Sequence, residues 1–424
     1  MMSAAHSRCQ APRPAPPTSV AIRRGKGQDG ARKTSFLPVG VTTQSVESEA
    51  PPPSRLVDLF CRLAAIPSPS GDEAACVEAV TVELADLGLN VLRDGAGAEV
   101  GSNGDNLYCR LPPTTRGQPL FFCAHLDTVP LMAPLEPVVV DGVIRNASPS
   151  IVGADNKAAL AVMLDAVRTL VVGGIPHAGV ELVFTIGEEQ GLVGSTAFAC
   201  STLHANTGFV FDHPGAIGGY VIAAPSRFVV RGRMRGRAAH SAIAPQDGIN
   251  AIVPLARAIA SFPQPPGAVN VNVGLVRGGS AMNVVPDCSE VTVDVRAIEH
   301  GEGQAVADEI AQGLRAAAAD GGCEIDVEIA HPYSAYRVPA DSGALSLALA
   351  AFARLGLVAS PWETRGGSDA NVFCQRGLDC INLTQGVVGF HAPDERVAVS
   401  DLELMRTVML QIIAEAVTPG AAND

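Results

Sequence analysis

The stretch FFCAHLDTVP, residues 121–130, constrains this chain more than any other. The apolar run 120–124 has the pattern of a strand that is buried on both faces. His125 and Asp127 follow at its end, and residues two apart on a pleated backbone lie on the same side. An imidazole and a carboxylate in this arrangement predict a metal site, in which one side chain binds the ion and the other braces the region from behind.

More side chains of the same type stand where other apolar runs end or where helices are expected to begin: Asp155, Glu188, Glu189, Asp212 and, much later, His391. Two imidazoles with several carboxylates suit two divalent cations, zinc above all. Such ions lie about 3.5–4 Å apart when they share a ligand. The short Asp155, after a glycine and at a helix start, suits the shared position. Glu188 and Glu189 are adjacent and point different ways, so we expect one as a ligand and the other to face the substrate water.

Strands and helices alternate through the first half of the ordered chain. We expect helices at 55–65, 72–87 and up to about 172, and strands at 104–111, 120–125, 181–186 and 208–211. This alternation predicts an α/β fold with a mostly parallel sheet. The candidate ligands would then lie at the carboxyl ends of the strands, where open α/β sheets bind their ligands.

The pattern changes near Pro225, where residues 227–236 begin to alternate apolar and basic side chains. A helix at 248–262, strands at 269–275 and 290–297, a helix at 303–319 and a strand at 323–330 complete a β-α-β-β-α-β order, which is ferredoxin-like. We therefore expect a small α+β domain inserted into the first. The predicted parts are an N-terminal extension at 1–54, the catalytic domain at 55–224 and 334–424, and the inserted domain at 225–333.

Charge and composition narrow the partners. The net charge is −13, which argues against nucleic acid or an anionic membrane as a partner. No apolar run reaches the roughly 18 residues of a membrane helix. The ten cysteines form no CxxC pair, so we expect reduced thiols in the cytoplasm. The first ~45 residues are rich in proline and in basic side chains. This composition suits a transit peptide, but no clear amphipathic helix is present and we expect a disordered extension.

Seven motifs together carry a resemblance to a known family: AHLDTVP, GADNKAAL, GEEQGLVGS, FDHPG, AAHSAIAPQDGINAI, GGSDAN and FHAPDE. In this order they resemble the dinuclear-zinc metallopeptidases that include peptidase T, carboxypeptidase G and succinyl-diaminopimelate desuccinylase. The resemblance extends from about residue 56 to the C-terminus, and SPSGDE with GADNKA points to the peptidase T-like branch. It implies a zinc-exopeptidase-like catalytic domain, an inserted domain that serves as lid and dimerisation module, and a homodimer.

The resemblance also implies a ligand set for two zinc ions (Zn2+) per subunit. His125 and Asp212 would hold one ion, Glu189 and His391 the other, and Asp155 would bridge them. The peptide bond after Asp155 is expected to be cis.

Further roles are implied by the same resemblance. Asp127 would orient a metal-binding histidine from behind, and Glu188 would be the general base. His240 would reach a neighbouring active site and stabilise the oxyanion. Two residues, Asn283 and Arg296, would line the carboxylate end of the substrate. Two others, Gly366 and Gly367, would form a backbone turn near the metals.

The function implied is hydrolysis of small peptides by an exopeptidase of the tripeptidase or aminopeptidase type. An N-acyl amino acid deacylase or a glutamate-releasing carboxypeptidase with the same two metals is the alternative, since pocket lining and lid closure separate these activities. A non-catalytic binding protein on this fold would be expected to lack Glu188, which is present. His213, next to Asp212, is interpreted as structural because adjacent side chains diverge.

Overall fold

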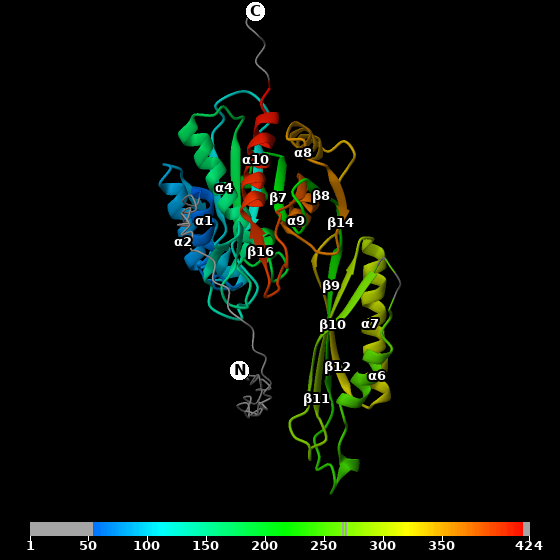
Figure 1. The fold of residues 1–424 in the computed structure, drawn as a ribbon. Helices are drawn as coiled ribbons and strands as arrows, with labels where there is room; N and C mark the ends of the chain where they lie inside the picture. Colours follow the sequence, from blue (N-terminus) through cyan, green and yellow to red (C-terminus); the bar gives the residue numbers. More distant parts are fainter. Residues whose placement is uncertain (1–53, 265–266, 268, 419–424) are drawn as a thin grey trace, which may run out of the picture. The chain divides into compact units, whose positions relative to one another are not determined.

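A computed structural model describes residues 54–264, 267 and 269–418 of the chain (Figure 1). The extension predicted at 1–54 lies outside the described residues except for Ser54. Within the described part, no helix has the length and apolar character needed to cross a membrane.

The larger sheet has a parallel centre. Its order is β1-β2-β6-β3-β7-β15-β8-β13, with β14 beside β8. The strands β6, β3, β7 and β15 are parallel, whereas β1–β2, β2–β6, β15–β8 and β13–β8 are antiparallel. This confirms the predicted α/β class with a mostly parallel central sheet. The strand bounds are β1 Val91–Arg93, β2 Leu107–Leu111, β3 Leu120–His125, β6 Val180–Thr185, β7 Thr207–His213, β8 Gly219–Ala224, β13 Tyr336–Arg337, β14 Ser360–Glu363 and β15 Asp379–Thr384.

Both faces of this sheet are covered, so its central strands are buried over nearly their whole length and are rich in apolar residues. On one face Phe122 stacks on Phe209 with ring centres 5.4 Å apart, beneath α1, α2, α4, α8 and α10. On the other face Phe121 meets Phe373 of α9 at 5.1 Å. The helices are α1 Arg55–Ala64, α2 Ala74–Ala85, α3 Gly97–Val100, α4 Ala154–Gly173, α5 Val193–Ala197, α8 Gly343–Arg354, α9 Asp369–Gln375 and α10 Val399–Glu415.

A three-stranded sheet of order β16-β5-β4 lies within the same part of the chain. It consists of β4 Pro137–Val140, β5 Val143–Asn146 and β16 Arg396–Ala398. Because β16 pairs with β5, the segment just after His391 is joined to the segment that leads into α4.

The region from Ser226 to Tyr333 forms its own antiparallel sheet, β10-β11-β9-β12, with a separate core (Figure 1). Apolar residues such as Phe228 and Val230 face α6 and α7, and basic residues of the same strand alternate with them. This is the expected ferredoxin-like arrangement; the domain boundaries themselves stay a prediction. The elements are β9 Ser226–Arg235, α6 Ile252–Ala260, β10 Val269–Gly278, β11 Cys288–Ala297, α7 His300–Asp320 and β12 Glu324–Tyr333.

Gly208 of β7 tests how tightly the central sheet is packed. A Cβ placed on it would lie 2.0 Å from the Phe121 ring, the residue that it faces on β3. We expect Gly208→Ala to lower the free energy of unfolding by about 1–3 kcal/mol, because the ring has to move out of its packed position. Urea denaturation measures the change.

Gly313→Ala is the matched control, since a Cβ on this glycine of α7 meets no atom within 4 Å. There we expect a gain of up to about 1 kcal/mol from helix propensity. Equal stability of wild type and Gly208→Ala would contradict the close packing of Phe121 on β7.

Candidate metal centre and substrate pocket

His125 is the last residue of β3 and is almost fully buried, with 1% of its surface exposed. Its Nδ1 lies 3.0 Å from the carbonyl oxygen of Asp127 and 3.3 Å from Asp127 Oδ1. Its Nε2 therefore faces the other way, 3.3 Å from Asp155 Oδ1 and 3.7 Å from Asp212 Oδ1. One ring nitrogen is held by its neighbour, and the other is directed at two carboxylates.

Asp127 holds the loop that carries the two glutamates in place as well as His125. Its Oδ1 accepts the backbone N–H of Glu188 at 3.0 Å, and its Oδ2 accepts the N–H of Glu189 at 3.2 Å and the hydroxyl of Ser70 at 2.6 Å. These bonds tie the end of β3 to the loop after β6. Asp127 thus orients both His125 and the glutamate pair, although it is fully buried and cannot reach solvent itself.

Asp155 lies between the two histidines. Its Oδ1 is 3.3 Å from His125 Nε2, and its Oδ2 is 3.1 Å from His391 Nε2. His391 is also 2.7 Å from Glu189 Oε1. The peptide bond between Asp155 and Asn156 is cis, as the resemblance implied. The arrangement gives two trios that share Asp155: one with His125 and Asp212, the other with His391 and Glu189.

Glu395 supports the loop that carries Asp155. Its carboxylate is buried, and one oxygen accepts the backbone N–H groups of Val152, Gly153 and Ala154 at 2.8, 2.6 and 3.1 Å. The other oxygen accepts the N–H of Asp155 at 3.3 Å. Sequence reasoning missed this residue, although it ends the FHAPDE motif. An acidic residue four positions after His391 was the available signal.

Electrostatics show an excess of negative charge in this cluster. Burial, followed by the charge of Asp212, raises the pKa of Glu188 well above its ordinary value. Burial and the charge of Asp155 raise the pKa of Asp212 to about 8. Hydrogen bonds to Asp155 and Glu189 raise the pKa of His391 to about 10. All three shifts favour the protonated form of the group, because an added proton offsets the negative charge of carboxylates that are packed together out of water.

This donor set fits divalent cations. Two groups of three have ligand atoms within 4.8 Å of one another: His125, Asp155 and Glu189 form one, and His125, Glu188 and Asp212 form the other. The second group includes Glu188, to which the resemblance assigns the role of base. The trios around Asp155 differ from these two groups in that together they include both histidines. Imidazole nitrogens and carboxylate oxygens together are donors that zinc accepts.

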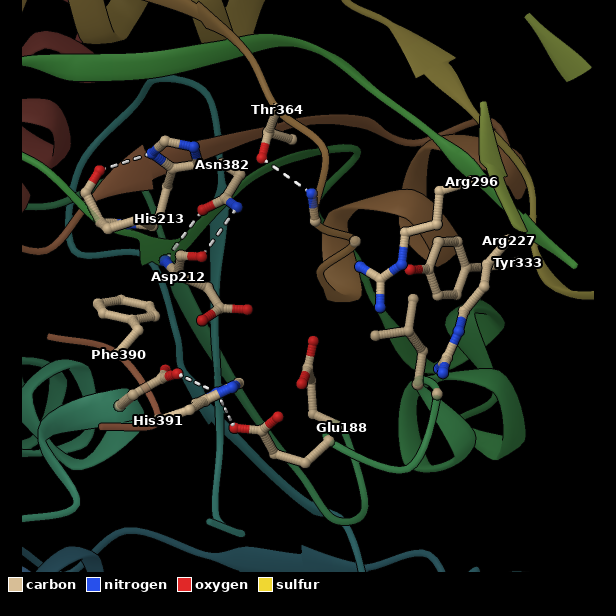
Figure 2. A pocket seen from close by; sticks show the side chains of 17 residues that line it. Glu188, Asp212, His213, Arg227, Arg296, Tyr333, Thr364, Asn382, Phe390 and His391 are labelled. Atoms are coloured by element: carbon tan, nitrogen blue, oxygen red, sulfur yellow. Dashed lines mark hydrogen bonds and ion pairs between the residues drawn. The ribbon is translucent and has the colours of Figure 1, made fainter. Parts of the chain in front are cut away.

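A pocket opens over these groups (Figure 2). Figure 2 shows Glu188 between Asp212 and His391 on one side and Arg296 on the other. The lining residues that the sequence singled out are Asp155, Glu188, Glu189, Asp212, Arg296, Gly366, Gly367 and His391. The remainder include four that it did not single out, namely Arg227, Tyr333, Asn382 and Phe390.

Gly367 is required by its neighbour Tyr333. A Cβ at Gly367 would lie 2.3 Å from the tyrosine ring and 2.4 Å from its hydroxyl oxygen. The GGSDAN segment therefore passes directly over Tyr333 at the pocket wall. The sequence pointed to a turn at Gly366 and Gly367 but not to the aromatic side chain that makes a glycine necessary there.

His240 and Asn283 do not line the pocket of their own chain. Both are exposed, and they lie beside each other: the N–H of Ser241 donates to the carbonyl of Asn283 at 3.0 Å. His240 Nδ1 accepts the N–H groups of Ala242 and Ile243, each at 3.2 Å. Their implied roles at an active site stay predictions.

His213 lines the pocket but makes no contact with the metal-ligand cluster among the interactions of the described residues. Its Nδ1 lies 2.7 Å from the carbonyl oxygen of Pro214, and its ring rests near Trp362. Burial lowers its pKa. These contacts agree with the structural interpretation of this histidine.

Two segments match known families. Residues 225–322 match a peptidase dimerisation domain, and residues 106–217 match peptidase family M28. Protein YqjE of Bacillus subtilis (strain 168) is 31% identical over 366 residues, which cover 85% of this chain and 98% of that protein.

Solved structures of peptidases are also similar to this chain. Aminopeptidase PepT from Bacillus cereus ATCC 10987 is 32% identical with a TM-score of 0.75, and a tripeptidase from Staphylococcus aureus subsp. aureus Mu50 is 28% identical with a TM-score of 0.79. Each comparison covers 85% of this chain and 98% of the other. A dinuclear metal-binding peptidase of the M20 family from Bacillus subtilis, 16% identical, shares the fold with a TM-score of 0.63 over 86% of this chain and 98% of that one.

Glu395→Gln tests the support of Asp155. The substitution removes the charge that accepts four backbone N–H groups but keeps the size of the side chain. We expect cation affinity to fall about 10–100-fold, as is typical when groups that hold a metal ligand are changed. Competition with a chelating dye measures the affinity.

Asp394→Asn is the matched control, because this neighbouring side chain is 75% exposed and pairs with Arg396 at the surface. It should leave the affinity unchanged. A wild-type affinity in Glu395→Gln would mean that the loop holds Asp155 without this carboxylate.

Proposed function

The chain belongs to the peptidase T-like branch of the M20 metallopeptidases, and we propose that it is a two-zinc exopeptidase that removes the N-terminal residue of short peptides, above all tripeptides. The observation that carries the proposal is the position of Asp155 between His125 and His391, with Glu188 beside them in an open pocket. The similarity to an aminopeptidase and to a tripeptidase over nearly their whole lengths supports the substrate class.

The proposed ligand set follows the two trios. His125 and Asp212 would hold one cation, His391 and Glu189 the other, and Asp155 would be shared. Two divalent cations there would lower the pKa of a water toward neutrality and polarise the scissile carbonyl. Mixed imidazole and carboxylate ligands favour zinc among the common divalent ions.

Glu188 is proposed as the general base. Its carboxylate faces the pocket, and Asp127 holds its backbone N–H at 3.0 Å. The carboxylate would take the proton of the attacking water and deliver it to the leaving amine.

We also propose a cytoplasmic homodimer. A peptidase dimerisation domain occupies residues 225–322. His240 and Asn283 are exposed on it and absent from the pocket lining of their own chain, which supports action in the partner's site. There His240 would stabilise the oxyanion and Asn283 would contact the substrate's carboxylate end. Free thiols at the cysteines of the described residues support a reducing compartment.

Hydrolysis of a panel of free tripeptides, dipeptides, N-acetylated tripeptides and N-acyl amino acids tests the activity. We expect zinc-restored enzyme to cleave free tripeptides and to lose activity after chelation. Glu188→Gln should lower kcat by about 10²–10⁴, the usual contribution of a general base, while cation affinity stays near that of wild type.

The panel also separates the alternatives. Cleavage of acylated substrates alone would move the function to a deacylase with the same metals. Release of the C-terminal residue would identify a carboxypeptidase. Full activity after complete removal of metal would contradict the two-zinc mechanism.

Mixing two inactive variants tests the role of His240 across subunits. We expect His240→Ala and Glu188→Ala to be inactive or nearly so as separate homodimers. In a mixed dimer, one site combines an intact Glu188 with an intact His240 from the other chain. Subunit exchange should therefore restore part of the activity, measured as tripeptide cleavage over time. No recovery, with exchange verified by mass spectrometry, would place His240 outside the partner's site.

A further inference from the structure

The wall of the pocket opposite the metal ligands is a row of three side chains on neighbouring strands. Arg227 of β9 is paired directly with Arg296 of β11 and with Tyr333 of β12. Residues that face each other in this way on one side of a sheet have Cβ atoms about 5 Å apart. All three line the pocket, and Figure 2 shows them together on the side away from His391.

Two arginines in direct cross-strand positions repel each other, and such pairs normally destabilise a sheet. Here they share a single acid. Arg227 Nε donates to Asp294 Oδ1 at 2.6 Å, and Arg296 Nε donates to Asp294 Oδ2 at 2.9 Å. Both guanidinium groups are thereby fixed through Nε, which leaves their terminal NH2 groups for other partners. One carboxylate for two guanidinium groups leaves a net positive charge.

The rest of the same strand face is balanced one to one. Farther along β9, every second residue from position 231 is an arginine, namely Arg231, Arg233 and Arg235. Each pairs with an acid on a neighbouring strand. Arg231 lies 3.5 Å from Glu328, Arg233 lies 3.2 Å from Glu290, and Arg235 lies 2.6 Å from Asp326. The excess of positive charge on this face therefore occurs at the pocket end of the strand.

Within the described part of the chain, the metal side of the pocket adds no direct ion pair to this row. Among the described residues, no ion pair within 4 Å joins Glu188 to Arg227 or Arg296. One terminal nitrogen of Arg296 donates to the carbonyl of Arg365 at 3.3 Å, which is a neutral acceptor. Burial raises the pKa of Tyr333, so its hydroxyl stays a neutral hydrogen-bond donor. The row thus offers two charged donors and one neutral donor to whatever enters the pocket.

We propose that Arg227 binds a second carboxylate of the substrate, namely the side chain of an acidic C-terminal residue whose α-carboxylate lies on Arg296. The enzyme would then favour short peptides that end in aspartate or glutamate. In these residues two or three carbon atoms separate the carboxylates, which suits two guanidinium groups that are close enough to bind the two oxygens of one carboxylate, Asp294. Arginine is well suited to this task because its planar fork can bind a carboxylate through two hydrogen bonds.

This inference rests on the proposed peptidase activity, and the test separates the two. The substrates are alanyl-alanyl-glutamate and alanyl-alanyl-glutamine, which differ only in the charge of the last side chain. We expect wild-type enzyme to show a kcat/KM about tenfold higher for the glutamate peptide, which corresponds to one charge-assisted contact. Arg227→Gln should bring the ratio close to one. Arg227→Lys should keep part of the preference, since it retains the charge but not the fork.

Arg231→Gln is the matched control, because this arginine lies on the same strand face, pairs with Glu328 and is outside the pocket lining. It should keep the wild-type ratio. Circular dichroism and the unfolding temperature of each variant show whether it is folded, and the wild-type ratio tests the preference without any variant.

Equal kcat/KM values for the two peptides in wild type would overturn the inference, and so would an unchanged ratio in folded Arg227→Gln. In both cases cleavage of the glutamine peptide would leave the proposed peptidase function intact. No cleavage of either peptide by zinc-loaded enzyme would overturn both.

Discussion

The carboxylate of Asp155 is the contact on which the rest of the site depends. Among the described residues it is the single group within hydrogen-bonding distance of both His125 and His391, which are 266 positions apart in the sequence. A side chain shared in this way has to be placed more accurately than either histidine. The buried Glu395 positions Asp155, because its carboxylate accepts hydrogen bonds from the backbone N–H groups that lead into α4. The negative charge that accumulates as a result is the physical reason why the cluster suits cations.

The sheet explains how residues so distant in sequence come together. His125 and Asp212 end or nearly end parallel strands, and the loop after β6 carries the glutamate pair. Parallel strands bring their carboxyl ends to one edge, where the loops are free to carry polar groups. The opposite wall comes from a different sheet, through Arg296 and Tyr333. The carboxylate and histidine cluster and the arginine wall thus come from separate sheets that both line one pocket.

Much of the fold was predictable because its signals are local. Apolar runs predicted the central strands, and the change of periodicity near Pro225 predicted the second sheet. The strands β8, β13, β14 and β15 were not anticipated, and two of them, β13 and β14, have only two and four residues. Their pairing depends on partners far along the chain. Of the antiparallel outer strands, β2 was expected as the strand at 104–111, but its pairing with β1 and β6 was not, because pairing partners are not encoded in local periodicity.

For the site, the residues themselves determined which side chains are chemically suited to hold cations: His125, Asp155, Glu189, Asp212 and His391 were all selected from the printed sequence. The tertiary structure decided how they are divided around Asp155, and it alone revealed the contacts of Glu395 and of Arg227. A carboxylate that binds backbone N–H groups and an arginine that shares an acid with its cross-strand neighbour have ordinary sequence contexts. Their significance arises from contacts between distant segments, and such contacts exist only once the chain has folded.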